Sequence, residues 1–171
     1  MFDFVVEFVS DLDLFGVEKM KRVREYDEAI FSRFADLSAG EKNDCICNEV
    51  TGDATYFASQ LADMVEITEF INDEENTFWV DEIEVAFNEY GESVEELINF
   101  LPSVSSPHHY QEGDGDTKYT FNYKRWDSEC QNFEQASRTM QENMTEALRI
   151  CGEMKDSYST FRSLIAKLLQ K

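Results

Sequence analysis

The sequence predicts a mainly α-helical, single-domain bundle with one long C-terminal helix and a small β-hairpin. Three observations support this fold class: few helix breakers, apolar residues at helical spacing, and a long heptad pattern near the C-terminus. The 171-residue chain has only seven Gly and two Pro, and 42% of its residues are hydrophobic. A chain of this length and composition can bury a core, so its acidity does not indicate a disordered tail.

The first segment, from Phe4 to Val9, fits either a strand or a helix. It is rich in β-branched and aromatic residues, which favour strands. However, Phe4, Phe8, Leu12 and Phe15 recur at the spacing of one helix face, which favours a helix.

Two helices are expected next, at residues 17–37 and 53–71. The inward-facing residues of the first recur at helical spacing and are Val23, Tyr26, Ile30, Phe34 and Leu37. Asp53 is expected to cap the N-terminus of the second helix. The inward-facing residues of the second are Phe57, Leu61, Met64 or Val65, and Phe70.

Residues 79–101 predict two shorter helices, which complete an acidic helical part over about residues 1–101. The first runs from Trp79 to Tyr90, with an apolar stripe formed by Trp79, Val80, Ile83, Phe87 and Tyr90. Ser93 and Glu96 match a capping box, which predicts a new helix from Val94 to Leu101. Pro102 is expected to stop this helix.

Residues 102–124 are expected to form a loop and a β-hairpin, the hairpin lying near residues 108–123. The stretch Thr117–Tyr123 alternates, with Tyr119, Phe121 and Tyr123 on one side, and it follows the turn-forming sequence GDGD at 113–116.

The long C-terminal helix is expected over about residues 125–170. Steps of four and three from Trp126 reach thirteen positions, of which only Ser137 is polar. The bulky residues of this seam are Trp126, Phe133, Met140, Met144, Met154, Phe161 and Leu168. The seam suits the longest helix of an antiparallel bundle, or a coiled coil with another subunit. Gly152 marks a place where the helix could kink.

The charge is concentrated in the middle of the chain. The formal net charge is −21, and the 75 residues between Lys42 and Lys118 contain 19 Asp and Glu and no Lys or Arg. Such a surface repels nucleic acid and anionic membranes and attracts basic proteins. Residues 118–171 hold nine bases against seven acids, so the C-terminal segment can offset only part of this charge.

The predicted acidic face is a series of carboxylates spaced three or four residues apart with no interleaved base. Carboxylates at this spacing on a helix repel each other by a few tenths of a kcal/mol per pair. The members of this face are Asp63, Glu66, Glu69, Asp73, Glu74, Glu75, Asp81, Glu82, Glu84, Glu89, Glu92, Glu95 and Glu96.

Two explanations suit a face whose carboxylates repel one another. The face increases solubility, or it binds a basic partner that relieves the repulsion. Rows of carboxylates can imitate a phosphate backbone and occupy a site that evolved for DNA or RNA. Phe78, Trp79 and Tyr90 stand beside the acids, either as aromatic anchors for a partner or as part of the core.

No catalytic, cofactor or metal site is expected from the motifs. The only histidines are the adjacent His108 and His109, and Cys45-x-Cys47 lacks the second cysteine pair of a zinc site. Asp11-x-Asp13 and Asp114-x-Asp116 resemble the start of calcium loops, but neither continues with the required ligands. No glycine-rich phosphate loop is present.

A reduced, cytoplasmic compartment is expected. No apolar run approaches the roughly 18 residues of a membrane span, and the first residues lack the positive charge of a signal peptide. Cys130 and Cys151 are too far apart along the predicted helix to bond to each other within it.

The sequence therefore predicts a non-enzymatic protein that masks a basic surface of a partner. The partner would be a nucleic-acid-binding protein or a nuclease toxin, and the chain would act as a nucleic-acid mimic or an immunity protein. The alternative is a helical scaffold or adaptor that forms a homodimer or hetero-oligomer through its C-terminal helix. An enzyme whose site forms only in a complex is a third, weaker option.

Overall fold

The structure is a computed structural model, and it describes residues 3–107, 115–121 and 133–170. For residues 3–15, 133 and 134 it describes the backbone only. The described chain is mainly helical, as predicted. Its helices are α1 (Asp3–Ala35), α2 (Ala39–Asp53), α3 (Ala58–Ile71), α4 (Asp81–Val104) and α5 (Phe133–Leu169), with a 3₁₀ turn η1 (Glu74–Asn76). The strands are β1 (Thr55–Phe57), β2 (Ser105–Pro107) and β3 (Lys118–Phe121).

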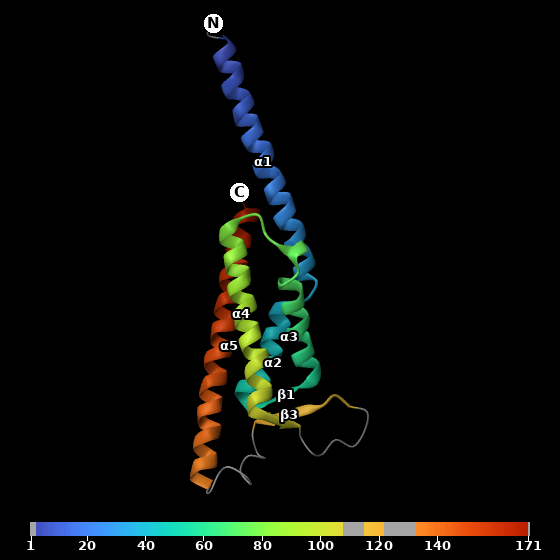
Figure 1. Cartoon of the computed structure of the whole chain (residues 1–171), viewed down its shortest axis with the longest axis vertical. Coiled ribbons are helices and arrows are strands. Elements are labelled where there is room, and N and C mark those ends of the chain that lie inside the picture. The colour runs from blue at the N-terminus through green and yellow to red at the C-terminus, as the bar shows by residue number, and fades with distance from the viewer. Residues whose placement is uncertain (1–2, 108–114, 122–132, 171) are drawn as a thin grey trace.

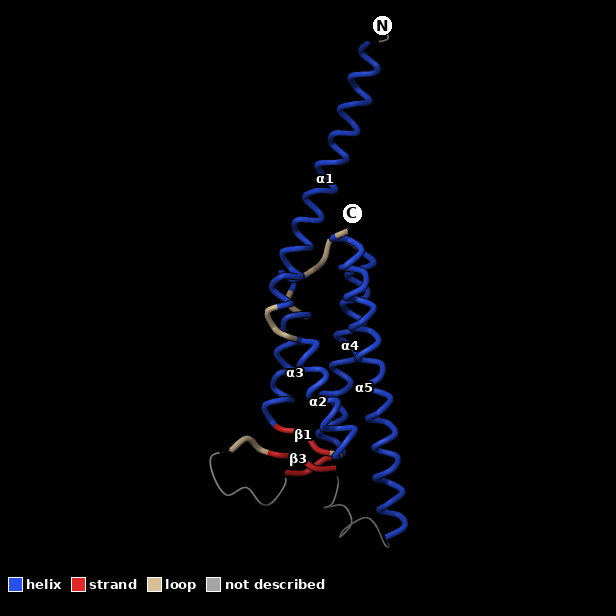
Figure 2. Tube along the Cα trace, turned by 180° about the vertical axis from the view of Figure 1, so that it is seen from behind, coloured by secondary structure: helices blue, strands red, loops and turns tan. Residues whose placement is uncertain are grey.

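Helices α2 to α5 lie side by side in an elongated bundle that the small sheet closes at one end (Figure 1). Helices α4 and α5 are antiparallel, because Ser93 meets Ser157 while Glu96 meets Arg149. Helix α1 packs on the bundle only with its C-terminal part, and its N-terminal half extends beyond the opposite end (Figures 1 and 2).

An aromatic cluster around Phe34 forms the centre of the core. The Phe34 ring lies 5.2 Å from Phe87 and 5.6 Å from both Phe70 and Phe161, measured between ring centroids. Most of these contacts are edge-to-face or tilted, the arrangements that aromatic pairs favour. Because the four rings come from α1, α3, α4 and α5, the cluster joins helices that are distant in the sequence.

The predicted hairpin is present as part of a three-stranded antiparallel sheet of order β1–β3–β2. Strand β3 coincides with the alternating stretch, and it pairs with β2 on one side and with β1 on the other (Figure 2). Phe121 is buried, and Tyr119 stacks on Tyr56 with ring centroids 5.0 Å apart. Tyr123 lies outside the described residues. Strand β1 was not predicted, because its three residues are too few to show a pattern.

The predicted boundary at Asp53 is wrong. Asp53 is the last residue of α2, and α3 begins five residues later, after β1. Helix α2 has polar residues and two glycines, so it was not predicted. Its buried residues nevertheless recur at helical spacing, and they are Ala39, Asn43, Ile46, Cys47 and Val50.

The predicted break at Ser93 is also wrong, because α4 is continuous from Asp81 to Val104. Ser93 lies in the middle of α4, where its hydroxyl donates to the Tyr90 carbonyl instead of capping a helix. Pro102 lies inside α4, which ends two residues after it. Burial of Leu101 and Val104 holds this last turn against the core.

Candidate functional site

The N-terminus of α4 is anchored by Asp27 of α1. The fully buried Asp27 carboxylate accepts the backbone N–H groups of Trp79 at 2.7 Å and Val80 at 3.1 Å. Glu84 accepts the N–H of Phe78 at 2.8 Å. These carboxylates hold residues 78–80 extended, which explains why the helix predicted from Trp79 begins only at Asp81.

We call the outward side of the first four turns of α4 the acidic stripe, and its residues are Asp81, Glu82, Val85, Glu89 and Glu92. All five side chains are exposed, and in the described part of the chain none of the four acids forms an ion pair or hydrogen bond through its side chain. Helix α4 contains no Lys or Arg. Asp81 and Glu82 lie in the first turn, where the helix dipole favours negative charge. Glu89 and Glu92 lack that compensation.

Two polar contacts mark the edges of the acidic stripe. On one side, Glu95 accepts a hydrogen bond of 2.9 Å from the side chain of Asn72, at the end of α3. On the other side, Glu96 pairs with Arg149 of α5 at 2.5 Å. The stripe is therefore the strip of α4 left uncovered between α3 and α5.

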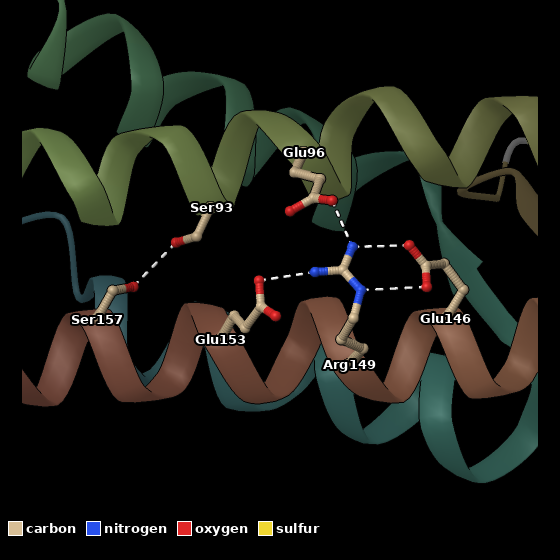
Figure 3. Close-up of polar contacts among 6 residues, drawn as sticks. All are labelled: Ser93, Glu96, Glu146, Arg149, Glu153 and Ser157. Carbon is tan, nitrogen blue, oxygen red and sulfur yellow. Dashed lines mark hydrogen bonds and ion pairs between the residues drawn. The ribbon is translucent and has the colours of Figure 1, made fainter.

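Arg149 is shared among three carboxylates, as Figure 3 shows. Besides Glu96 it binds Glu146 and Glu153 of its own helix, each at 2.7 Å. These hydrogen bonds raise the pKa of Arg149, and its guanidinium lowers the pKa of Glu146. Because Arg149 is saturated within the chain, it leaves the acids of the stripe without a counter-charge.

Other members of the predicted acidic face have internal partners. Lys42 binds Asp63 at 3.1 Å and Glu66 at 2.6 Å, and these contacts raise the pKa of Lys42. Asp73 accepts the backbone N–H of Glu75 in the 3₁₀ turn. These acids already have partners within the described chain, so binding another protein through them would require breaking those internal contacts.

Three further acids of the predicted face, Glu69, Glu74 and Glu75, are exposed. None of their side chains has an ion pair within the described residues, although the Glu75 carbonyl accepts from Arg33 at 3.3 Å. They lie on the end of α3 and on η1, outside the acidic stripe as defined.

Only one of the three predicted aromatic anchors is accessible. Phe78 and Tyr90 are core residues, 3% and 0% exposed, and the Tyr90 hydroxyl donates to Asn43. For these two residues the structure confirms the alternative that they belong to the core, because their rings are buried between helices. Trp79 is 55% exposed and stacks on Tyr26 at 4.3 Å. Val85, which is 56% exposed within the stripe, was not singled out from the sequence.

The seam of the C-terminal helix is divided between core and surface. Met154 and Phe161 are fully buried, Met144 and Leu168 are half-buried, and Met140 is 38% exposed. Trp126 and the side chain of Phe133 lie outside the described residues, and α5 begins at Phe133. From Ala147 to Ile165 most seam residues pack against the chain's own core, and α5 is assigned as one helix that continues through Gly152.

Two of the described cysteines, Cys47 and Cys151, are in contact within the core. The Cys47 thiol donates to Cys151, and this bond together with burial raises the pKa of Cys47. Asp11 and Asp13 lie inside α1 rather than in a calcium loop, while His108, His109 and Asp114 lie outside the described residues. Within the described ranges, no group of three or more His, Cys, Asp or Glu could hold a metal ion.

The helices in the described part of the chain include none with both the length and the apolar character needed to cross a bilayer. The chain matches no family model, no curated protein and no solved structure.

Proposed function

We propose that the chain is a non-enzymatic binding protein whose acidic stripe masks a basic surface of a partner protein. The partner would be a nucleic-acid-binding protein or a nuclease toxin. The supporting observation is that four exposed carboxylates of the stripe lack any internal counter-charge in the described chain, although Arg149 and Lys42 neutralise acids close by. Fixed, unpaired charge of one sign attracts a surface of the opposite sign.

The density of charge on α4 resembles that of a nucleic-acid strand. Seven acids occur between Asp81 and Glu96, a stretch that spans about 22 Å at 1.5 Å per residue. This is about one carboxylate per 3 Å of axis, and one strand of DNA carries one phosphate per about 3.4 Å. The similarity favours a partner site that ordinarily binds phosphates.

Apolar contact area accompanies the charge. Val85 stands among the acids of the stripe, and Trp79 precedes its first residue by two positions. Both are more than half exposed. Charged rims give fast association, whereas buried apolar and aromatic contacts give most of the binding energy. The combination supports protein binding more than solubility alone.

The alternative, an adaptor that assembles through the C-terminal helix, has less support. Most described seam residues between Ala147 and Ile165 are already buried inside the chain.

Capture with the immobilised protein tests the proposal. Basic proteins retained at about 0.1 M salt should be released at about 1 M, because the Debye length falls from about 10 Å to about 3 Å. Duplex DNA should compete with the chain for the retained protein. The variant E89K/E92K should weaken binding of the purified partner about tenfold or more, mainly by slowing association.

A matched control reverses two exposed acids elsewhere. In E28K/E41K the same charge change falls on α1 and α2, at exposed residues whose side chains form no ion pair or hydrogen bond in the described chain. Its affinity should stay within about twofold of the wild type. An equal loss of affinity in both variants would mean that only net charge matters. Unchanged affinity of E89K/E92K would refute the proposal that the acidic stripe binds the partner.

A further inference from the structure

The N-terminal part of α1 projects from the bundle as a helical arm, which we define as residues 3–24. Both views show most of this arm standing clear of the other helices (Figures 1 and 2). Arg24 marks its base, where the guanidinium donates to the Leu169 carbonyl at 2.6 Å. The arm is about 33 Å long at 1.5 Å per residue. The side chains of residues 16–22 are exposed, and Val17 and Met20 are each 67% exposed.

A helix with this sequence is not expected to be stable alone in water. Residues 3–15 contain three Phe and three Val, together with three Asp. These residue types have weak helix propensity, and most helices in proteins are stabilised by packing against other elements. A partner that packs on the arm would therefore stabilise this helix, and in Figures 1 and 2 no other drawn helix lies along most of its length.

The charges of the arm are segregated along its length. Residues 3–15 hold four acids and no base, whereas residues 16–24 hold four bases and one acid. In an antiparallel pair of such helices, each acidic half lies beside the basic half of the other. In a parallel pair, like charges would meet along the whole arm. The charge pattern is therefore complementary to itself in only one orientation.

The basic half has charges available for this contact. Lys19 and Arg22 are exposed and have no side-chain partner in the described chain. The helical spacing of Phe4, Phe8, Leu12 and Phe15 continues to these same two bases, at steps of four and three.

We propose that the helical arm pairs in antiparallel orientation with the arm of a second copy of this chain. The pair is centred between residues 13 and 14, so Lys19 of one copy falls opposite Phe8 of the other, between Glu7 and Asp11. The aliphatic stem of Lys19 covers the apolar face while its ammonium group reaches the two carboxylates. Arg22 occupies the equivalent position one turn further along. The two bundles then lie at opposite ends of the paired arms.

Molar mass in solution is the first test, measured by sedimentation or light scattering over a concentration series. The full-length chain, 19.9 kDa, should form a dimer at high concentration. The variants E7K/D11K and K19E/R22E should each be monomeric, because each places like charges opposite one another. An equimolar mixture of the two should recover a dimer. K21E is a control for charge reversal in the basic half and should still form a dimer, since Lys21 lies off the paired face and is held by Glu25 at 3.7 Å.

Orientation needs a separate probe. In the variant V5C, residue 5 of one copy lies opposite residue 22 of the other, so the two introduced thiols do not meet in an antiparallel pair. Under mild oxidation V5C should form no more covalent dimer than the wild type. A strong crosslink between the two introduced thiols would overturn the antiparallel arrangement.

Two other results would overturn the proposal as a whole. One is a wild-type chain that stays monomeric at every concentration. The other is a dimer that persists in both charge variants, which would place the interface elsewhere. Circular dichroism and thermal unfolding should show that both variants keep the bundle, since the arm projects away from its core.

Discussion

At the scale of single residues, Asp27 is a fully buried carboxyl group whose two oxygens both accept backbone N–H groups. Burial raises its pKa, two backbone N–H groups oppose that shift, and the nearby Glu84 charge adds to it. The net direction is upward, so desolvation outweighs the hydrogen bonds. Asp27 is nevertheless needed, because without it the N–H groups of Trp79 and Val80 would lose their acceptor.

Asp27 gives a prediction about stability and pH. D27N should destabilise the fold by about 1–3 kcal/mol near neutral pH, because an amide has only one acceptor oxygen for two buried donors. A folded-state pKa above the unfolded value means that the folded state binds more protons. The wild type should therefore gain stability relative to D27N as pH falls through the raised pKa toward about 4. Chemical denaturation of both proteins between pH 4 and 8 measures this difference.

Glu146 provides a control of opposite sign. Its pKa is lowered by Arg149, so its contribution is present above the unfolded pKa and is lost as pH falls through the lowered value. The stability difference between E146Q and the wild type should therefore shrink as pH falls, whereas the difference between D27N and the wild type should grow. The profiles of both variants must extend below about pH 4 to cross the lowered pKa of Glu146, and parallel profiles would contradict both assignments.

At the scale of elements, the position of α4 depends on its close approach to α3. A Cβ atom added at Gly91 would lie 2.9 Å from the Cγ2 atom of Ile71, closer than packing allows. Glycine at this position lets α3 and α4 approach each other closely. By contrast, a Cβ at Gly152 in α5 would meet no atom within 4 Å.

The two glycines predict opposite effects of the same substitution. G152A should stabilise the protein by about 0.5–1 kcal/mol, because Ala loses less backbone entropy in a helix. G91A has the same intrinsic gain, but overpacking against Ile71 should outweigh it and leave a net loss of about 1–2 kcal/mol. Urea denaturation of both variants tests this. Stabilisation by G91A would mean that α3 and α4 can move apart at little cost.

At the scale of the whole molecule, the negative charge is only locally compensated. In the described chain, Lys42, Arg149 and Lys155 bind four acids of the window between Lys42 and Lys118, namely Asp44, Asp63, Glu66 and Glu96. The window contains 19 acids. The remaining acids include those of the acidic stripe, whose carboxylates repel one another in the free protein. A bound basic partner would reduce this repulsion.

This repulsion predicts that E92K stabilises the free protein while it weakens partner binding. The introduced lysine would stand three or four residues from Glu89, Glu95 and Glu96, replacing repulsion by attraction at about 0.2–0.5 kcal/mol per pair. A gain of about 1 kcal/mol is expected at low salt, decreasing as salt is added. E142K on the mixed-charge helix α5 is the control and should change stability less. If E92K instead destabilised the chain, the acids of the stripe would be structural.

Local patterns determined most of the helices. Periodic apolar residues predicted the helix around Ile30 and Phe34, the long helix through Met154 and Phe161, and strand β3, because burying one face imposes a period that is visible in the sequence. Element ends were predicted less well. Asp53 and Ser93 have the chemistry of N-caps, but Asp53 is the last residue of α2 and Ser93 lies in the middle of α4.

The sequence by itself determined that this is a helical protein with a long stretch of uncompensated acids, because composition and periodicity are properties of neighbours along the chain. Only the tertiary structure decided which acids remain unpaired, which aromatics are buried and which helix projects. Lys42 and Arg149 reach Glu66 and Glu96 across 24 and 53 residues of sequence. Whether such charges meet depends on how helices pack, and the packing is set by the Phe34 cluster, whose rings come from four different helices.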